Sequence, residues 1–348
     1  MVLTRPGYVF PLTLGVIAIL AVLIAAAYAV HESASGSVRQ WVDRQALERD
    51  LHSAEVHVLH TFLAEPMGWD AVHVGGVPSL DPDYPDFVVE GEKVSLRGQP
   101  YRVVLDGREM MVRIIAVAGL ISIDTTRPGS VSAFLVTQGL DLAEASRLEA
   151  RLYDYEDDDD LRRLGGAEAD DYPDGRAPAN TYLRRASELC AVLGWDQLDL
   201  CRQPVLFDLY ANIVPGTPMS PAFMPDHVAS VLIDRERERE VALERLQAGQ
   251  ALTFADLFLP GWDSVHYDEF GYGPAGSEFL FLTQEAAGTL IRVARIRLTY
   301  GAFEAPYERM FEFLTGGEQV EAAFRIDDPG ELADFPATQP QSRQGFRR

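Results

Sequence analysis

The chain has 348 residues and a formal net charge of −23, with 53 acidic side chains against 30 basic ones. Hydrophobic residues make up 47% and aromatic residues 10%, which predicts a folded body and excludes an acidic disordered chain. So negative a protein is a poor partner for nucleic acid or anionic lipid surfaces, and we expect no nucleic-acid binding.

The N-terminal region is dominated by an apolar run. Residues 8–30 contain no charged side chain. One cation, Arg5, and one glycine, Gly7, lie just before this run. At 1.5 Å per residue a helix of this length extends about 34 Å, which exceeds a hydrocarbon core of about 30 Å. We therefore predict a transmembrane helix over residues 8–30.

Two cleavage sites fit this N-terminus. Ala27 and Ala29, before Val30, form the small-residue pattern of a signal peptidase site, which would release a soluble secreted protein. The apolar run is longer than the core of an ordinary signal peptide, about 7 to 15 residues. The alternative is cleavage on the cytoplasmic side, between Gly7 and Tyr8, which would keep the apolar helix on the mature chain.

The helical pattern continues past the apolar run. Apolar side chains recur every three to five residues to about residue 66, with charged residues between them. Either a separate amphipathic helix follows the membrane helix, or one helix of roughly 55 residues lies half in lipid and half on a domain. We favour the single helix. Residues 68–86, rich in Gly, Pro and Asp, are expected to form a loop.

Strand-like runs occur on both sides of a long helical stretch. The apolar period becomes helical at residue 140 and stays helical or irregular to about residue 260. The predicted fold is α+β: a long N-terminal helix packed on an antiparallel sheet, with a large, mostly helical insertion splitting the sheet. The predicted strands are residues 87–90, 101–105, 110–124, 277–283, 289–300 and 307–314.

Motifs for common enzyme chemistry are missing from the sequence. There is no HExxH, no GxSxG and no GxGxxG after a predicted strand, so we expect no enzyme. Cys190 and Cys201 lie eleven residues apart without a CxxC pair, which excludes a zinc ribbon. In an oxidising compartment they could form a disulfide, and two buried thiols are the alternative.

Residues 154–174 hold ten carboxylates within 21 residues. The D-x-D spacing of Asp157 and Asp159, followed by a glycine pair that can return the chain to Glu168, suits a calcium ion held by a flexible loop. The register of an EF-hand is missing. The alternative is a solvated acidic loop neutralised by Arg162, Arg163 and bulk ions.

A short leader ending in glycine, an apolar helix with an amphipathic continuation, and a sheet carrying an insertion together resemble the type IV pilin-like proteins. Short motifs within the insertion resemble those of one family, the type II secretion minor pseudopilin called general secretion pathway protein K. Three features depart from the family's pattern: Tyr155 in place of a tryptophan, Pro11 in the first helical turn, and N-I-V-P-G-T from Asn212, which matches the family's N-x-N-T-A segment only loosely. The similar segments are L-Y-D-Y-E-D-D-D from Leu152, G-A-E from Gly166 with Tyr172, P-A-N from Pro178, S-E-L from Ser187 and S-E-F from Ser277.

The fifth position after the Gly7 cleavage site is Leu12. Most pseudopilins carry a glutamate there, which neutralises the N-terminal amine of a neighbour inside the fibre. The resemblance implies that members of this family lack the glutamate and sit at the tip, where no subunit lies ahead of them.

The resemblance implies a non-catalytic minor pseudopilin at the tip of the type II secretion pseudopilus, which helps initiate assembly and export folded proteins across the outer membrane. Residues 8–30 would anchor it in the bacterial inner membrane with its body in the periplasm. A prepilin peptidase would cleave between Gly7 and Tyr8 and methylate the new amine. Other minor pseudopilins in a tip complex are expected partners, and secreted cargo or the outer-membrane channel are further ones.

Calcium is the cofactor that the resemblance implies. The first choices as ligands are Asp154, Asp157, Asp159 and Glu168, with Asp170 and Asp171 next. Two other functions remain open: a secreted or membrane-tethered periplasmic enzyme with an acidic metal-binding loop, and a minor type IV pilin. The expected domains are a leader (1–7), a transmembrane helix (8–30), its amphipathic continuation (31–66), a pilin-like sheet domain (67–128 and 270–326), the insertion (129–269) and a disordered tail (327–348).

Overall fold

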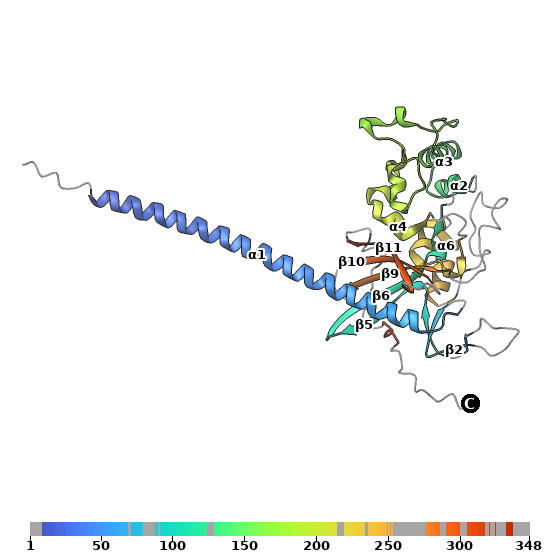
Figure 1. Ribbon diagram of the computed structural model, residues 1–348, viewed down its shortest axis with the longest axis horizontal. Helices are drawn as coiled ribbons and strands as arrows, with labels where there is room; N and C mark the ends of the chain where they lie inside the picture. Colours follow the sequence, from blue (N-terminus) through green and yellow to red (C-terminus); the bar gives the residue numbers. More distant parts are fainter. Residues whose placement is uncertain are drawn as a thin grey trace, which may run out of the picture. The chain divides into compact units, whose positions relative to one another are not determined.

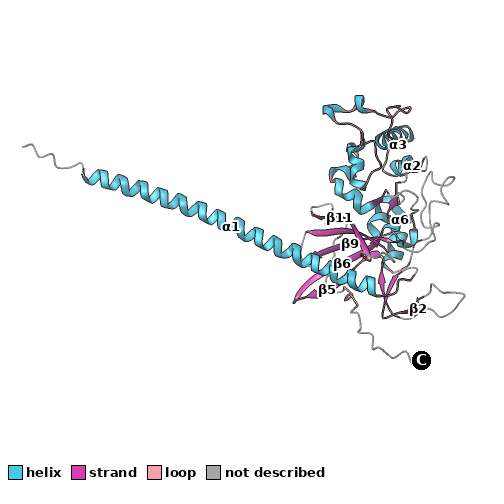
Figure 2. Cartoon of the chain, viewed as in Figure 1, coloured by secondary structure: helices cyan, strands magenta, loops and turns pink. Residues whose placement is uncertain are grey.

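The structure is a computed structural model, and it divides the chain into two units, Met1–Asp50 and Leu51–Arg348. Figure 1 shows the chain coloured along its sequence, and Figure 2 shows its helices and strands. The described residues are 9–68, 71–78, 88–89, 91–123, 129–213, 219–233, 236–248, 250, 252, 276–285, 290–299, 305–316, 320, 324 and 332–336.

The first unit is formed by helix α1 (Val9–Ala64), which continues without a break into the second unit. The sequence therefore forms the single long helix rather than two. Among the described residues α1 is the one helix long and apolar enough to cross a membrane, and its apolar window is not buried in the protein. Gly36 does not interrupt the helix.

The last four turns of α1 belong to the second unit and bury one face. Leu51, Val58 and Phe62 are at most 2% exposed and recur at helical spacing. The ring of Phe62 meets the rings of Phe279 and Phe281 edge-on, at centroid distances of 4.7 and 5.5 Å. This segment of α1 therefore packs on the sheet through an aromatic contact.

The central sheet has five antiparallel strands in the order β11, β10, β9, β6, β5. The first two strands in sequence precede the insertion and the last three follow it, so the pairing of β6 with β9 closes the split sheet. This is the predicted α+β architecture. The strands are β5 (Arg97–Leu105), β6 (Arg108–Ala116), β9 (Glu278–Glu285), β10 (Ile291–Leu298) and β11 (Tyr307–Thr315).

Strand β9 shows how the sheet separates two cores. Phe279 and Phe281 contact α1, while Leu280 and Leu282 belong to the core shared with the insertion. All four side chains are at most 1% exposed. Because successive side chains point to opposite faces of a strand, the sheet carries α1 on one face and the insertion on the other.

Three short two-stranded sheets accompany the central one, and they correct parts of the sequence prediction. Residues 68–86, expected to be a loop, contain β1 and β2, since a four-residue strand carries too little pattern to detect. The strand predicted over 110–124 ends at Ala116, and a turn of 3-10 helix follows it. The pairs are β1 (Ala71–Val74) with β4 (Glu92–Ser95), β2 (Val77–Pro78) with β3 (Val88–Val89), and β7 (Ile121–Ser122) with β8 (Ala211–Asn212).

The insertion between β6 and β9 is built from short helices, many of them 3-10 turns. Trp195 lies at its centre, 0% exposed, and its Nε1 donates to the carbonyl of Leu148 at 3.1 Å. The α-helices are α2 (Ser130–Thr137), α3 (Leu142–Glu156), α4 (Phe207–Tyr210), α5 (Asp226–Leu232) and α6 (Glu236–Gln247). The 3-10 helices are η1 (Val117–Gly119), η2 (Ala169–Asp171), η3 (Pro173–Gly175), η4 (Ala186–Ala191), η5 (Trp195–Gln197), η6 (Asp199–Arg202), η7 (Pro204–Leu206) and η8 (Pro221–Phe223).

Residues 332–336 lie along β5. The Arg102 amide donates to the carbonyl of Ala333 at 2.9 Å, and the Phe335 amide donates back to Arg102 at 2.8 Å. The Arg102 guanidinium pairs with Asp334 at 2.6 Å. The prediction of a disordered tail from residue 327 therefore does not hold for these five residues, because main-chain pairing fixes them to the sheet.

Candidate functional site

The acidic loop begins at the end of α3. Asp141 caps the start of this helix by accepting a hydrogen bond from the Glu144 amide at 2.9 Å. Ala145, Leu148 and Leu152 form its buried face. Asp154 lies in the last turn and is 0% exposed. Burying a carboxylate is costly unless it is paired or hydrogen-bonded, so Asp154 needs such partners.

Arg163 supplies those partners. Its amide lies 3.2 Å from Oδ2 of Asp154 and 3.3 Å from Oδ1, and its Nη1 donates to Oδ1 at 2.8 Å. The same guanidinium nitrogen pairs with Asp157. These two carboxylates raise the pKa of Arg163 above its ordinary value. The arginine therefore acts as the counter-ion of both carboxylates.

Gly166 passes directly over Asp154. A Cβ at this position would lie 1.9 Å from Oδ2 of Asp154, a distance that no side chain tolerates. A glycine is therefore required where the returning loop crosses the end of α3.

Glu168 and Asp171 cap the next turn reciprocally. The Glu168 amide donates to Oδ2 of Asp171 at 2.9 Å, and the Glu168 side chain accepts from the Asp171 amide. Glu168 is 7% exposed, and its Oε1 has no hydrogen-bond partner within the described residues. Burial, together with the negative charges of Asp154 and Asp157, raises the pKa of Glu168. The carboxylate of Glu168 thus lies near other negative charges, and one of its oxygens accepts no hydrogen bond from the described residues.

The six candidate ligands differ in their environment. Asp159 and Asp170 are exposed, and Oδ1 of Asp159 accepts from the Leu161 amide at 2.7 Å. Arg162 pairs with Asp171 at 2.8 Å. In the part of the chain that the structure describes, no three His, Cys, Asp or Glu side chains converge closely enough to hold a metal ion. Two arginines instead neutralise part of the loop.

The two cysteines are joined by a disulfide, with their Cα atoms 5.5 Å apart. It links η4 to η6 within the insertion. The predicted processing residues, Gly7 and Tyr8, lie outside the described residues. Leu12 is helical.

Sequence reasoning missed two sets of charged residues. Glu55 in α1 is buried among arginines that stand more than two hundred residues away in the chain. Asp208 is 2% exposed and receives Arg185 at 2.6 Å and the Ser187 amide at 3.1 Å. The only available signal was an acidic residue at an otherwise buried position of a helix, which does not reveal a distant partner.

Residues 119–202 match the family model described as Type II secretion system (T2SS), protein K. The match runs from the end of η1 to the end of η6, so it covers the first part of the insertion, including the acidic loop. This segment is similar to the type II secretion protein K family. The motifs from Leu152 to Ser187 that suggested this family lie inside the matched segment, and the resemblance is confirmed.

The fold is also similar to that of a known protein. A chain in the crystal structure of the GspK-GspI-GspJ complex from the enterotoxigenic Escherichia coli Type 2 Secretion System matches with a TM-score of 0.51. The two chains are 14% identical, and the match covers 80% of this chain and 99% of that one. This similarity confirms the pilin-like α+β fold. No curated protein sequence matches the chain.

Proposed function

We propose that this chain is a protein K of the type II secretion system, a non-catalytic tip subunit of the pseudopilus assembled with other minor pseudopilins. One observation carries the proposal: the same chain combines an insertion similar to protein K with a pilin-like body and one unbroken N-terminal helix. The similar crystal structure is of a complex of three components, GspK, GspI and GspJ. Companion subunits are therefore the partners we expect.

Helix α1 would serve this function in two ways. Its apolar N-terminal part would anchor the protein in the inner membrane, and its continuation would pack against companion helices. Val38, Trp41 and Val42 are between 50% and 64% exposed and recur at helical spacing, so they form an apolar stripe beyond the membrane segment. An exposed stripe of this kind gains stability when a second helix covers it. The body would then lie in the periplasm, and the insertion could reach cargo or the outer-membrane channel.

Processing at the N-terminus tests this proposal. The full chain, expressed with a type II secretion system and its prepilin peptidase, should yield a mature protein that starts at Tyr8 with a methylated amine. Intact-mass spectrometry and N-terminal sequencing measure this directly. A Gly7→Val variant should remain unprocessed, while an Ala29→Val control should be processed normally. A mature protein starting at Val30 would identify a secretory signal and overturn the proposal.

We also propose that the acidic loop binds calcium. The donors are all carboxylates, the hard oxygen ligands that calcium accepts with loose geometry. Glu168 leaves one buried oxygen without a partner, and so does Oδ1 of Asp157. Asp154, Asp157, Asp159 and Glu168 would hold the ion, with Asp170 and Asp171 nearby. The ion would neutralise the like charges that raise the pKa of Glu168 and would tie the loop to α3.

Calcium should raise the thermal stability of the full-length protein in detergent. A ligand that binds only the native state at one hundred times its Kd adds about 2.7 kcal/mol. Melting with excess calcium, with magnesium and with a chelator measures the difference. Glu168→Gln removes a repelled charge, so we expect it to melt no lower than wild type in chelator and to lose the calcium response. The exposed control Asp196→Asn should keep that response. Equal melting temperatures of wild type with calcium and with chelator would contradict the site.

A further inference from the structure

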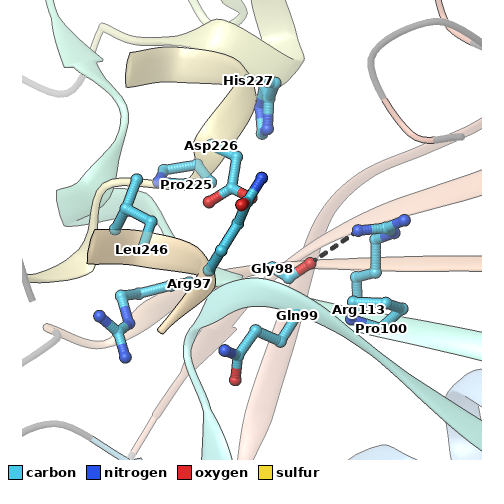
Figure 3. Close-up of a pocket in the computed structure, with 10 residues that line it drawn as sticks. Arg97, Gly98, Gln99, Pro100, Arg113, Pro225, Asp226, His227 and Leu246 are labelled. Atoms are coloured by element: carbon cyan, nitrogen blue, oxygen red, sulfur yellow. Dashed lines mark hydrogen bonds between the residues drawn. The ribbon is translucent and has the colours of Figure 1, made fainter. Parts of the chain in front are cut away.

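A cavity of about 300 Å³ lies between the central sheet and the insertion, away from the acidic loop. Figure 3 shows the side chains around it. Strands β5 and β6 form one wall, and the start of α5 and the end of α6 form the other. The polar residues that line it are Arg97, Gln99, Arg113, Asp226, His227 and Gln247.

A bulge in β5 opens this cavity. Arg97 pairs with Ile115 and Pro100 pairs with Arg113, so Gly98 and Gln99 fall outside the regular register. Gly98 has a φ of 81°, which favours glycine, and a Cβ there would meet the Ile115 side chain at 3.0 Å. The bulge therefore turns polar backbone and side chains of β5 toward the insertion.

Arg113 is the side chain that defines the chemistry of the cavity. Its Nη1 donates to the carbonyl of Gly98 at 2.9 Å and its Nη2 donates to the carbonyl of Phe324 at 3.0 Å. Its Nε is shut off from solvent and has no hydrogen-bond partner in the described residues. Burial lowers the pKa of Arg113 to about 10. Two carbonyls thus position this guanidinium but do not neutralise it.

The surroundings leave room for an anion. Asp226 lies near enough for Arg113 and Arg97 to lower its pKa, although burial outweighs them and the net shift is upward. Within the described residues no carboxylate lies in ion-pair contact with Arg113. His227 is neutral near pH 7, because burial lowers its pKa to about 4. The charge of Arg113 therefore faces the cavity without a neutralising ion pair from the described residues.

We propose that this cavity binds a carboxylate group, held by the guanidinium of Arg113, which lines it. A guanidinium edge presents two parallel N–H groups that match the two oxygens of a carboxylate. The volume suits one small acid or the end of a peptide. The carboxylate could come from a free organic acid or from the C-terminus of a partner chain.

Thermal melts of the full-length protein in detergent test the proposal. Sodium acetate should raise the melting temperature saturably above sodium chloride at equal ionic strength, because the bound anion stabilises the native state. Arg113→Gln should lose this response, and the exposed control Arg147→Gln should keep it. Asp226→Asn removes the competing carboxylate and should bind acetate about tenfold more tightly. This gain would not arise if Arg113 were merely structural.

Two further arms identify the source of the carboxylate. A tripeptide with a free C-terminus should raise the melting temperature more than the same peptide with an amidated C-terminus if the site accepts a chain end. Stabilisation by acetate alone would assign the cavity to free organic acids. The proposal is overturned if acetate acts no differently from chloride, or if Asp226→Asn binds acetate no more tightly than wild type. The second result decides the matter even where Arg113→Gln does not fold.

Discussion

Replacing Glu55 by alanine should lower the free energy of unfolding by about 3 kcal/mol, the cost of breaking a buried ion pair by removing one partner. Glu55 lies on the face of α1 that packs on the sheet and is 0% exposed. Its Oε2 accepts from Arg292 at 2.9 Å, and Arg309 lies 2.6 Å from its Oε1. Without Glu55, both arginines would keep their charge next to an apolar helix face.

Glu312 limits the damage but does not remove it. This residue of β11 pairs with Arg292 and Arg309 at 2.6 Å each. Its side chain is 46% exposed, so water screens these contacts and they contribute less than a buried pair. One exposed carboxylate cannot balance two arginines as well as a second, buried one does.

Urea or thermal unfolding of the full-length protein measures this loss. The matched control is Glu48→Ala, which removes an exposed ion pair with Arg44 in α1, at 3.1 Å. We expect the control to change the free energy of unfolding by less than about 1 kcal/mol. If Glu55→Ala were as mild as the control, the network would not anchor α1 to the sheet.

Acid should destabilise the protein through His227 as the pH falls below 6.5, the ordinary pKa of histidine. This histidine of α5 is buried, and its Nε2 donates to the carbonyl of Leu209 at 3.0 Å. Its ring lies between those of Tyr210 and Phe324, at centroid distances of 4.9 and 4.8 Å. Burial lowers its pKa from 6.5 to about 4, since a charged imidazole would have no solvent there.

The sign of the pH effect follows from this shift. Between pH 6.5 and 4 the unfolded chain binds a proton at residue 227 and the folded chain does not, so stability falls as the pH is lowered. The loss between pH 7.5 and 4.5 should be about 2.5 kcal/mol. Above pH 6.5 the neutral ring is favoured in both states, and the contribution disappears.

Unfolding measured at several pH values, for the full chain in detergent, checks this expectation. The glutamine of His227→Gln can still donate to the Leu209 carbonyl but cannot titrate. The stability of this variant should therefore fall less between pH 7.5 and 4.5 than that of wild type, by about 2.5 kcal/mol. The control His60→Gln changes an exposed histidine of α1 and should leave the pH profile as in wild type. Identical profiles for His227→Gln and wild type would show that residue 227 binds its proton equally in the folded and unfolded chains, and would contradict this expectation.

Local patterns in the sequence were sufficient for the main elements. The apolar run and its helical continuation predict α1, because burial on one face imposes a helical period. Alternation in residues 291–298 predicts β10 in the same way, since a strand turns successive side chains to opposite faces. The short strands β1 and β4 were missed because four residues hold too little of any period.

The acidic loop shows where local reasoning stops. The sequence places ten carboxylates and two arginines together, and both a calcium site and a neutralised loop fit that composition. The structure pairs Arg163 with Asp154 and Asp157, and it places Gly166 over Asp154. These contacts depend on how the loop returns across the end of α3, which spacing does not specify.

The sequence by itself determined the long helix, the α+β fold with its split sheet, and the protein K motifs, because each depends on a pattern among residues that are close together in the chain. Only the tertiary structure decided which charges meet. Glu55 pairs with Arg292 and Arg309, and Arg113 donates to the carbonyl of Phe324, although more than two hundred residues separate these partners in the chain. Such pairs depend on the order and register of the strands, and these are set by the packing of the whole domain rather than by any local period.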